Sequence, residues 1–339
     1  MPKAIALYSG GLDSTLSVLI MKRLGVDVMP ILFVTDFGCS VSRRSGGKPT
    51  FPATEPLGFS IEKHYIGEEF LKLVKNPKFG HGKNMNPCID CKALMLKEAR
   101  KLMEERCADF IITGEVLGQR PMSQRRDTFP KIEKEAGVVG LVVRPLCAKL
   151  LKPSLAEEKG LIDRDNLYAF SGRSRKPQIA LASELGVTEY PQPAGGCLLT
   201  DPIYSYRLRE LLARNPSPSM REIQFLRLGR HFRTSDGFSI IVGRDEQENA
   251  EIEKMIMPED YALQLTVDYG SPFVVAEAGI SEEGLNLAAG LCVRYSSARR
   301  ERLVPVQIVQ NETTEIVQAS PAGEREIEQF MIQPPDVRD

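Results

Sequence analysis

Ser9-Gly10-Gly11-Leu12-Asp13-Ser14 is the stretch that decides the fold of this chain, because it joins two patterns of different period. The apolar residues 4–8 before it predict a β-strand, and residues 15–24 after it predict an α-helix. A glycine-rich turn from strand to helix points backbone N–H groups and the positive end of a helix dipole at one position, which suits a phosphate. Ser9 and Ser14 add hydroxyl donors, and Asp13 stands where it would hold Mg²⁺ or stabilise the turn. The alternative is an ordinary helix N-terminus, in which Asp13 only offsets the dipole.

The first half of the chain alternates strand and helix patterns. Strands are predicted at residues 26–34, 110–113 and 138–143, and helices at residues 12–24, 91–106 and 176–185. This alternation predicts an α/β fold with a doubly wound parallel sheet, in which ligands bind beyond the carboxyl ends of the strands. Residues 38–83 show no clear period, so surface loops over the site are expected there.

A proline- and serine-rich segment divides the chain. We expect a first domain at residues 1–214, a linker at residues 215–221 and a smaller α+β domain at residues 222–310, which mixes short strands with one helix near residues 284–300. Residues 311–339 are rich in Thr, Glu, Pro and Gln, which predicts a flexible acidic tail.

Composition places the chain among ordinary globular proteins, with 42% hydrophobic and 26% charged residues. No run approaches the length of a membrane span, and the chain enters a strand directly after Met1-Pro2-Lys3, so we expect a cytoplasmic protein with no membrane partner. Basic residues outnumber acidic ones over residues 1–219, which is compatible with a polyanionic substrate such as tRNA. Seven cysteines in such a chain are better explained as thiols, ligands or catalysts than as a disulfide framework.

Three cysteines have a chemically informative context. Cys88 and Cys91 have C-x-x-C spacing at the entrance of a predicted helix, where the dipole lowers the pKa of a thiol. Cys197 follows Gly195 and Gly196, which suggests tight backbone packing with an accessible sulfur. Such thiols bind a metal or attack sulfur. The other four have no such context, and two of them, Cys107 and Cys147, are expected to be packing residues; the remaining two are Cys39 and Cys292.

Several motifs together resemble known families. The residue 9–14 stretch resembles the PP-loop of ATP pyrophosphatases, which cleave ATP between the α- and β-phosphates. Residues 112–119, 123–124 and 144–146 resemble the catalytic domain of tRNA 4-thiouridine synthetases, and residues 86–91 with 196–197 are similar to the cysteine positions of tRNA 2-thiouridine synthases. The resemblance covers about residues 1–214. It implies an ATP-dependent tRNA sulfurtransferase that adenylates a uridine oxygen and replaces it with sulfur. The nucleotide contacts that it implies are Ser9, Gly10, Gly11, Asp13, Ser14, Gly114 and Gln119.

These families divide in their sulfur chemistry. In one branch two cysteines carry a persulfide and then form a disulfide; in the other, three cysteines hold a [4Fe–4S] cluster. Cys88, Cys91 and Cys197 supply the three ligands of the second branch, and three thiolates without an obvious fourth ligand favour an open cluster over a closed zinc site. The catalytic residues implied are Asp13, Cys91 and Cys197, with tRNA and a sulfur donor as partners. The donor would be sulfide, a cysteine desulfurase or a sulfur carrier. Persulfide chemistry, or zinc with His81 as a fourth ligand, stays open, as does the oligomeric state.

The second half has a looser resemblance. Residues 235–244 with Asn249, and residues 288–290 and 295–299, resemble the RNA-binding domain of NFACT proteins over about residues 220–310. Arginines suit phosphate contacts and base stacking, and the candidates are Arg227, Arg230, Arg233, Arg299 and Arg300. Their alternative role is ordinary ion pairing on a solvated face.

Residues 171–176, Ser-Gly-Arg-Ser-Arg-Lys, form a second possible anion site before a helix. This segment would hold a tRNA backbone or a nucleotide phosphate, or it is a plain helix start.

Two other functions remain consistent with part of the sequence. A PP-loop ligase would use a non-sulfur nucleophile and would not need the three cysteines. A non-enzymatic RNA-binding sensor would use nucleotide and cluster only for switching, and would release no pyrophosphate.

Overall fold

The computed structural model describes residues 1–37, 54–190, 197–266 and 269–335. The chain forms two compact units, Met1–Thr200 and Asp201–Asp339. Each unit has its own sheet and its own core, and each is described by itself below.

The first unit is built on a five-stranded sheet in the order β3-β2-β1-β4-β5. The strands are β1 (Lys3–Leu7), β2 (Asp27–Val34), β3 (Glu62–Tyr65), β4 (Phe110–Thr113) and β5 (Val142–Val143). All four pairings are parallel. β1 is central and β4 has no exposed residue, as expected where helices cover both faces of a sheet. The predicted doubly wound α/β fold is therefore confirmed.

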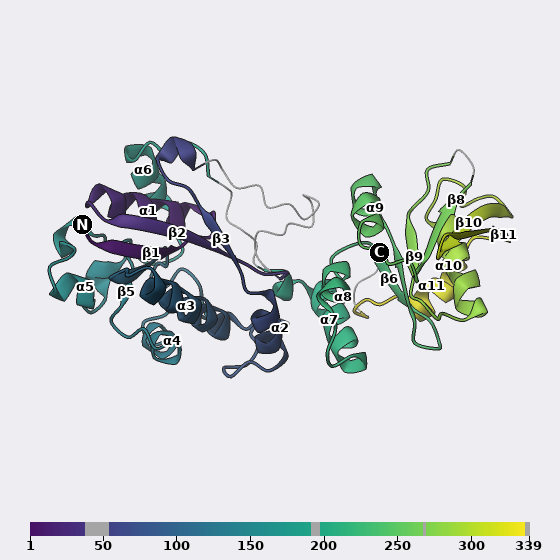
Figure 1. Ribbon diagram of the computed structural model, residues 1–339, viewed down its shortest axis with the longest axis horizontal. Helices are drawn as coiled ribbons and strands as arrows, with labels where there is room; N and C mark the ends of the chain where they lie inside the picture. The colour runs from purple at the N-terminus through teal and green to yellow at the C-terminus, as the bar shows by residue number, and fades with distance from the viewer. Residues whose placement is uncertain (38–53, 191–196, 267–268, 336–339) are drawn as a thin grey trace. The chain divides into compact units, whose positions relative to one another are not determined.

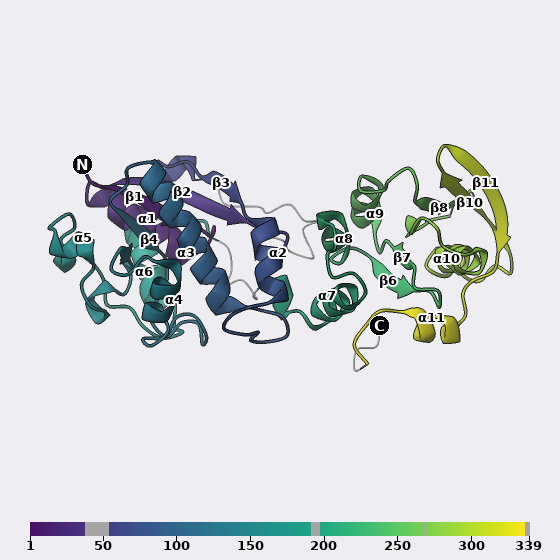
Figure 2. The same cartoon turned by 60° about the horizontal axis from the view of Figure 1, so that its bottom comes forward.

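Helices cover both faces of this sheet (Figures 1 and 2). α1 (Leu12–Arg23) and α6 (Lys176–Glu184) pack against one face, and α3 (Cys88–Glu105) and α4 (Phe129–Ala136) pack against the other. α2 (Gly67–Lys75) packs beside α3, and α5 (Leu155–Glu158) is a single short turn. Because all strands are parallel, the turn from β1 into α1 and the N-terminus of α3 both lie at the carboxyl edge of the sheet.

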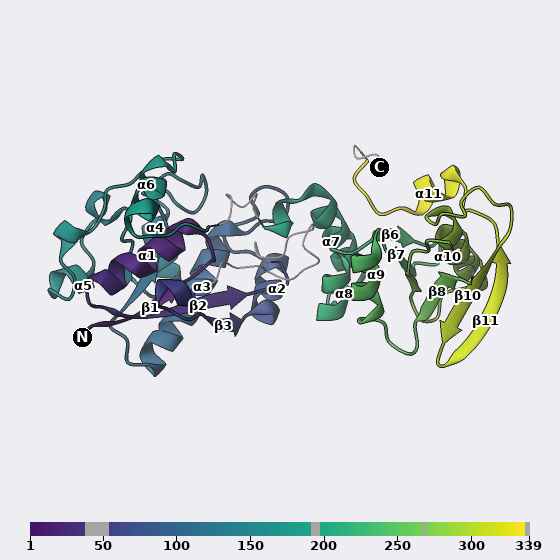
Figure 3. The same cartoon turned by 90° about the horizontal axis from the view of Figure 1, so that it is seen from above.

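The second unit contains a six-stranded antiparallel sheet in the order β11-β10-β8-β9-β7-β6. Its strands are β6 (Arg230–Arg233), β7 (Ser239–Val242), β8 (Tyr261–Leu265), β9 (Val274–Ala276), β10 (Val304–Gln310) and β11 (Thr313–Ala319). Figure 3 shows α10 (Glu282–Arg294) along this sheet, where its buried residues share a core with residues of all six strands. The other helices are α7 (Pro202–Arg214), α8 (Met220–Phe225), α9 (Glu246–Glu253) and α11 (Glu324–Phe330). The smaller α+β domain predicted from sequence is confirmed as a fold class.

The domain limits differ from those expected. α7 belongs to the second unit, because the buried Arg207 donates hydrogen bonds to the backbone carbonyls of Leu226 (3.1 Å) and Gly229 (3.2 Å). Residues 215–221 are consequently not a loose linker, and Ser219 caps α8 with a capping box.

The expected flexible tail is also wrong for the described residues. β11 pairs with β10 over seven residues, and Met331 forms a bridge to Phe232. Residues 336–339 lie outside the description. In the part of the chain that is described, no helix has the length and apolarity needed to cross a bilayer.

Candidate nucleotide and sulfur site

The turn between β1 and α1 has the geometry of an anion cradle. Gly10 has a φ of 75°, which favours glycine, and Gly11 stands at the N-cap position of α1 without any side-chain cap. No side chain at the N-cap position therefore accepts a hydrogen bond from the N–H groups of the first helical turn. Ser14 Oγ donates to the carbonyl of Gly11 at 2.8 Å and lies 3.2 Å from Ser9 Oγ. The predicted residues Ser9, Gly10, Gly11 and Ser14 thus lie together at the mouth of the turn.

Asp13 faces Gln119 across the site. Gln119 Nε2 donates to Asp13 Oδ2 at 2.9 Å, whereas Asp13 Oδ1 is buried and has no hydrogen-bond partner among the described residues. Burial raises the pKa of Asp13, and the Gln119 hydrogen bond and the charge of Arg175 oppose that rise only in part. A buried carboxylate oxygen without a hydrogen-bond partner is the type of atom that coordinates Mg²⁺ or accepts a hydrogen bond from one of its bound waters. Asp13 and Gln119, which were both expected to contact a nucleotide, therefore lie together at one site, and their contact with a nucleotide stays a prediction.

Gly114 connects β4 to this turn by direct backbone packing. A Cβ at Gly114 would lie 2.6 Å from Ser14 N and 2.7 Å from the Asp13 carbonyl carbon. Only glycine allows this close approach. Gly114 therefore positions the edge of the site, and whether it also contacts a nucleotide remains a prediction.

The segment at residues 171–176 lies beside the same site. Gly172 N donates to Leu117 O at 2.8 Å, and Ser171 bridges to Leu117 in parallel register, two residues from Gln119. Arg175 is the N-cap residue of α6, and its charge acts on Asp13. This position beside Asp13 would suit a nucleotide phosphate, and the choice between that ligand, a tRNA backbone and a plain helix start stays a prediction.

Gln178 lies at the candidate site, although no sequence pattern predicts it there. It is fully buried in the first turn of α6, and neither its Oε1 nor its Nε2 has a hydrogen-bond partner of good geometry among the described residues. The same amide nevertheless lies close enough to Asp13 to lower the pKa of that carboxyl. An amide in the first turn of a helix gives no sequence signal, and only its burial marks it.

A buried ion network lies behind the site. Arg144 Nε donates to Glu115 Oε2 at 3.1 Å and Arg144 Nη1 to Glu133 Oε1 at 2.6 Å, while its guanidinium stacks over the Phe129 ring. Burial lowers the pKa of Arg144, but the two carboxylates outweigh it and the pKa is raised. Glu115 Oε1 also lies 3.9 Å from Lys92 Nζ. This network joins Glu115, two residues after β4, to the first turns of α3.

The cysteines of the C-x-x-C motif open α3, as predicted. Cys88 and Cys91 are both half-buried in its first turn. Between them, Asp90 is buried and accepts hydrogen bonds from Lys78 N (2.9 Å) and Phe79 N (3.1 Å). Asp90 therefore fixes the loop that leads into the motif, a role that no sequence pattern indicates.

Cys197 is brought to the same region by two hydrogen bonds between the segments that flank the cysteines. Met85 N donates to Leu199 O at 3.1 Å, and Asn84 Nδ2 donates to Thr200 O at 2.8 Å. These contacts place the segment after Cys197 against the loop before Cys88. Gly195 and Gly196 lie outside the described residues.

The ligands of the predicted metal site are not arranged around one point in the described residues. In the described ranges, no three Cys, His, Asp or Glu side chains are arranged to hold a metal ion. The donor set fits a cluster in chemical type, since three thiols are present, but its geometry is not assembled. His81 Nε2 lies 2.8 Å from the carbonyl of Val74. This contact leaves Nδ1 for a ligand, so zinc with His81 as the fourth ligand stays a prediction.

The remaining cysteines differ in how far they are buried. Cys147 is buried, donates to Glu115 O at 3.3 Å, and has its pKa raised by burial to about 11. Burial likewise raises the pKa of Cys292 to about 12. Cys107 was predicted to be a packing residue, but this is wrong: it is exposed, with a φ of 51° just after α3. Cys39 lies outside the described residues.

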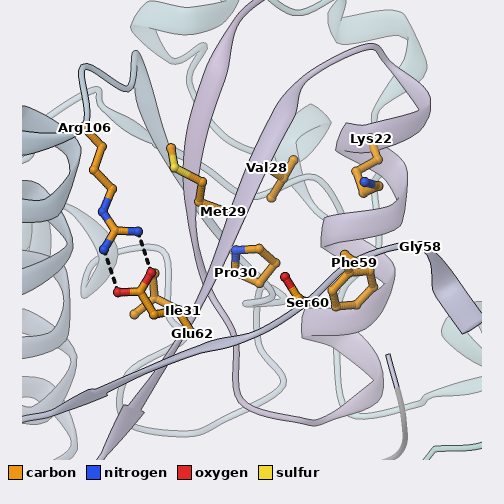
Figure 4. A pocket seen from close by; sticks show the side chains of 10 residues that line it. All are labelled: Lys22, Val28, Met29, Pro30, Ile31, Gly58, Phe59, Ser60, Glu62 and Arg106. Carbon is orange, nitrogen blue, oxygen red and sulfur yellow. Dashed lines mark hydrogen bonds and ion pairs between the residues drawn. The ribbon is translucent and has the colours of Figure 1, made fainter. Parts of the chain in front are cut away.

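A surface hollow of about 340 Å³ lies away from these residues (Figure 4). Its lining comes from the last turn of α1, the first half of β2, residues 58–62 and Arg106 after α3. Arg106 is held there by two hydrogen bonds to Glu62, of 2.6 and 2.7 Å. The hollow contains none of the predicted site residues and lies toward the amino ends of the strands, so we do not assign the nucleotide to it.

The five candidate arginines of the second unit have different surroundings. Arg233 is bound to Glu210 through two hydrogen bonds of 3.0 and 2.6 Å, and Arg230 stacks over the Tyr295 ring at 4.3 Å. Arg227 is half-buried near Glu251. Arg299 and Arg300 are exposed. The ion-pair alternative is therefore correct for Arg233. Arg230, Arg299 and Arg300 are taken up below, and a contact of Arg227 with RNA stays a prediction.

Two stretches of the chain match known protein families. Residues 1–149 match the family described as "Thiamine biosynthesis protein (ThiI)", and residues 229–331 match the "NFACT protein RNA binding domain". The first half is thereby confirmed to contain a ThiI-type PP-loop domain and the second half an NFACT-type RNA-binding domain. The similarity of the cysteine positions to tRNA 2-thiouridine synthases stays a prediction.

Curated relatives match over part of the first domain. A probable tRNA sulfurtransferase of Thermococcus kodakarensis is 28% identical over 130 residues, which cover 34% of this chain and 30% of the relative. A probable tRNA sulfurtransferase of Methanosarcina mazei is 28% identical over 127 residues, covering 34% and 29%. The chain thus spans about 30% of the length of these relatives.

Solved structures show only weak overall similarity. The C-terminal part of the fibronectin/fibrinogen-binding protein from Streptococcus suis has a TM-score of 0.29 at 17% identity, covering 78% of this chain and 97% of its own. A 4-thiouridine synthetase–RNA complex with bound ATP has a TM-score of 0.32 at 21% identity, covering 55% and 52%. At these TM-scores the similarity decides neither fold nor function.

Proposed function

We propose that this protein is an ATP-dependent tRNA sulfurtransferase, which adenylates a uridine carbonyl oxygen and replaces it with sulfur. One observation carries the proposal: the phosphate turn and the cysteine helix are joined at the carboxyl edge of one sheet. Gly114 packs on the backbone of Asp13 and Ser14, and its neighbour Glu115 lies 3.9 Å from Lys92, the residue after Cys91. A nucleotide bound at the turn and a base attacked by sulfur would then lie at the same edge of the sheet.

The first step follows from the turn. The uridine oxygen attacks the α-phosphorus of ATP, a new O–P bond forms, and the bond to the β-phosphate oxygen breaks to release pyrophosphate. The uncapped N–H groups of α1 and the hydroxyls of Ser9 and Ser14 would stabilise the charge that develops on the leaving pyrophosphate. Asp13 Oδ1 would hold Mg²⁺, and Arg175 would add positive charge from the start of α6.

The second step exchanges sulfur for oxygen. A sulfur nucleophile attacks the activated ring carbon, the C–S bond forms, and the C–O bond breaks with AMP as the leaving group. The target base must be unstacked to reach these residues. Cys91 and Cys197 would present the sulfur, since hydrogen bonds from residues 84–85 to the carbonyls of residues 199–200 bring their segments together.

We further propose that Cys88, Cys91 and Cys197 hold a [4Fe–4S] cluster. What supports it is the donor set of three thiols; the described geometry does not assemble them. When bound, such a cluster supplies an iron with an open coordination position for a sulfide. The alternative, a persulfide on one cysteine and a closing disulfide with the other, needs an added thiol reductant to reset the enzyme.

The test uses the full chain purified anaerobically, with ATP, Mg²⁺ and unmodified tRNA. Sulfide is the sulfur donor in one reaction, and a cysteine desulfurase with cysteine, which delivers persulfide sulfur, is the donor in a parallel reaction. We expect tRNA-dependent pyrophosphate release and a thiouridine detected by mass spectrometry of the digested tRNA. Cys91→Ser and Cys197→Ser should abolish thiolation and retain pyrophosphate release. Cys107→Ser is the matched control, because this exposed cysteine lies at the other end of α3.

The outcomes separate the alternatives. Pyrophosphate release without thionucleoside under every sulfur donor would favour a PP-loop ligase, and no tRNA-dependent release would leave a non-enzymatic sensor. A brown protein whose iron and labile sulfide are lost in each cysteine variant supports the cluster. A colourless protein that thiolates tRNA and accumulates a Cys91–Cys197 disulfide would establish the persulfide route.

A further inference from the structure

Positive charge in the second unit is concentrated in one turn. Residues 284–310 contain four arginines and a single acid, Glu301, although acids outnumber basic residues over residues 220–310 as a whole. Three of these arginines stand in the turn between α10 and β10, which we call the arginine turn, residues 296–303. They are Arg299, Arg300 and Arg302, and all three are exposed.

The other arginines of this unit are mostly engaged. Arg221 pairs with Asp260, Arg233 with Glu210 and Arg244 with Glu248. Within the described ranges, by contrast, no ion pair or hydrogen bond engages the guanidinium of Arg299, Arg300 or Arg302. A guanidinium without a carboxylate partner keeps its charge and donors for an external anion.

The backbone of the arginine turn is anchored to the core. Ser296 Oγ donates to Val293 O at 2.7 Å and accepts from Ala298 N at 3.0 Å, and Ala298 is buried in the main core of the unit. Glu301 N then donates to Ala298 O at 2.9 Å. The turn therefore presents its arginines from a fixed backbone, which lowers the ordering cost of binding.

An exposed aromatic residue lies next to this turn. Ser297 N donates to Gly270 O at 3.0 Å, so the residue before Gly270, Tyr269, lies beside the turn, and it is 43% exposed. Tyr295 is less suitable for stacking, because Arg230 already covers its ring. Arginines for phosphates and a ring for an unstacked base are the combination that single-stranded RNA loops require.

We propose that the arginine turn and Tyr269 form the RNA-contacting edge of the second unit, and that the occupant is a single-stranded loop or end of tRNA. The proposal deepens the function proposed above and rests on it for the identity of the RNA. It assigns binding to Arg299, Arg300 and Arg302 and withdraws it from Arg230 and Arg233, which hold the fold.

The test measures binding of full-length protein to unmodified tRNA between 50 and 200 mM KCl, chosen as roughly the range over which phosphate contacts dominate. The variant is Arg299→Glu/Arg300→Glu/Arg302→Glu. The matched control is Arg209→Glu/Lys254→Glu/Arg325→Glu, which changes the net charge equally at three other exposed positions of the same unit. If the three arginines contact phosphates, the slope of log K against log salt should flatten by about 2–3 and affinity should fall at least about tenfold, with little change in the control.

A second measurement does not depend on how the triple variant folds. Ultraviolet cross-linking of wild-type protein to tRNA, followed by mass spectrometry of peptides, should place uridine adducts on Tyr269 or on residues 296–303. Wild-type affinity in the arginine variant, equal loss in the control, or adducts confined elsewhere would each overturn the proposal. Failure of the proposed activity is distinguishable, because RNA would still bind at this edge while no thionucleoside is formed.

Discussion

Replacing Gly114 by alanine tests whether β4 and the phosphate turn are packed as described. The added Cβ would lie 2.6 Å from Ser14 N and 2.7 Å from the Asp13 carbonyl carbon, and both contacts are backbone atoms. A shift of about 0.8 Å is needed to bring the shorter contact to an ordinary 3.4 Å. Overpacking of this kind costs roughly 1–3 kcal/mol. For a unit of this size, a loss of about 2 kcal/mol lowers Tm by about 4–8 °C.

Calorimetry with and without ATP is the assay. Ligand at about 100 times its Kd stabilises a protein by about 2.7 kcal/mol, and this ATP-dependent rise in Tm should shrink in Gly114→Ala because the turn is displaced. Gly11→Ala is the matched control for stability. Its Cβ would meet only Ser9 Oγ at 3.5 Å, so the expected cost is the weaker N-cap, about 1 kcal/mol or less. A Gly114→Ala protein with wild-type Tm and a wild-type response to ATP would refute this account of the site.

Three other substitutions or treatments have defined outcomes. Burial raises the pKa of Asp13, so ionising this carboxyl costs the folded state free energy. As the pH rises from acid through the raised pKa, the metal-free wild type should therefore lose stability relative to Asp13→Asn. Urea midpoints measured from pH 4 to 7 test this, and a shift in the opposite direction would contradict it. Arg144→Met should cost about 3–5 kcal/mol, since it leaves buried carboxylates without their cation, and an unchanged urea midpoint would exclude the network. In native protein at pH 8, iodoacetamide should alkylate Cys107 but spare Cys147 and Cys292, whose pKa values lie at about 11 and 12, until urea unfolds the chain; equal labelling by mass spectrometry would show that they are not buried.

Local sequence patterns predicted most of the first sheet. The predicted strand at residues 110–113 matches β4 (Phe110–Thr113), and the predicted helix at residues 176–185 matches α6 (Lys176–Glu184) to within one residue. These segments carry a clear period, or a short apolar run that both faces of a parallel sheet bury. The strand expected at residues 138–143 is shorter, since only Val142–Val143 pair with β4.

Elements with weak local signals were missed. β3 (Glu62–Tyr65) contains no buried residue and is held by pairing with the end of β2. β11 (Thr313–Ala319) is nearly all exposed, which is why its composition suggested a flexible tail. In both cases backbone hydrogen bonds to a neighbouring strand decide the structure, and those bonds leave little trace in side-chain composition.

By itself, the sequence determined the phosphate turn, the cysteine helix and the identity of the residues on them, because each depends on neighbours within a few positions of the chain. Only the tertiary structure decided which distant residues join that turn. Gly114 reaches it through β4, Gln119 binds Asp13, and Arg175 with Gln178 arrive at the start of α6. The parallel sheet brings these segments to one edge, and such convergence follows from strand order rather than from any local pattern.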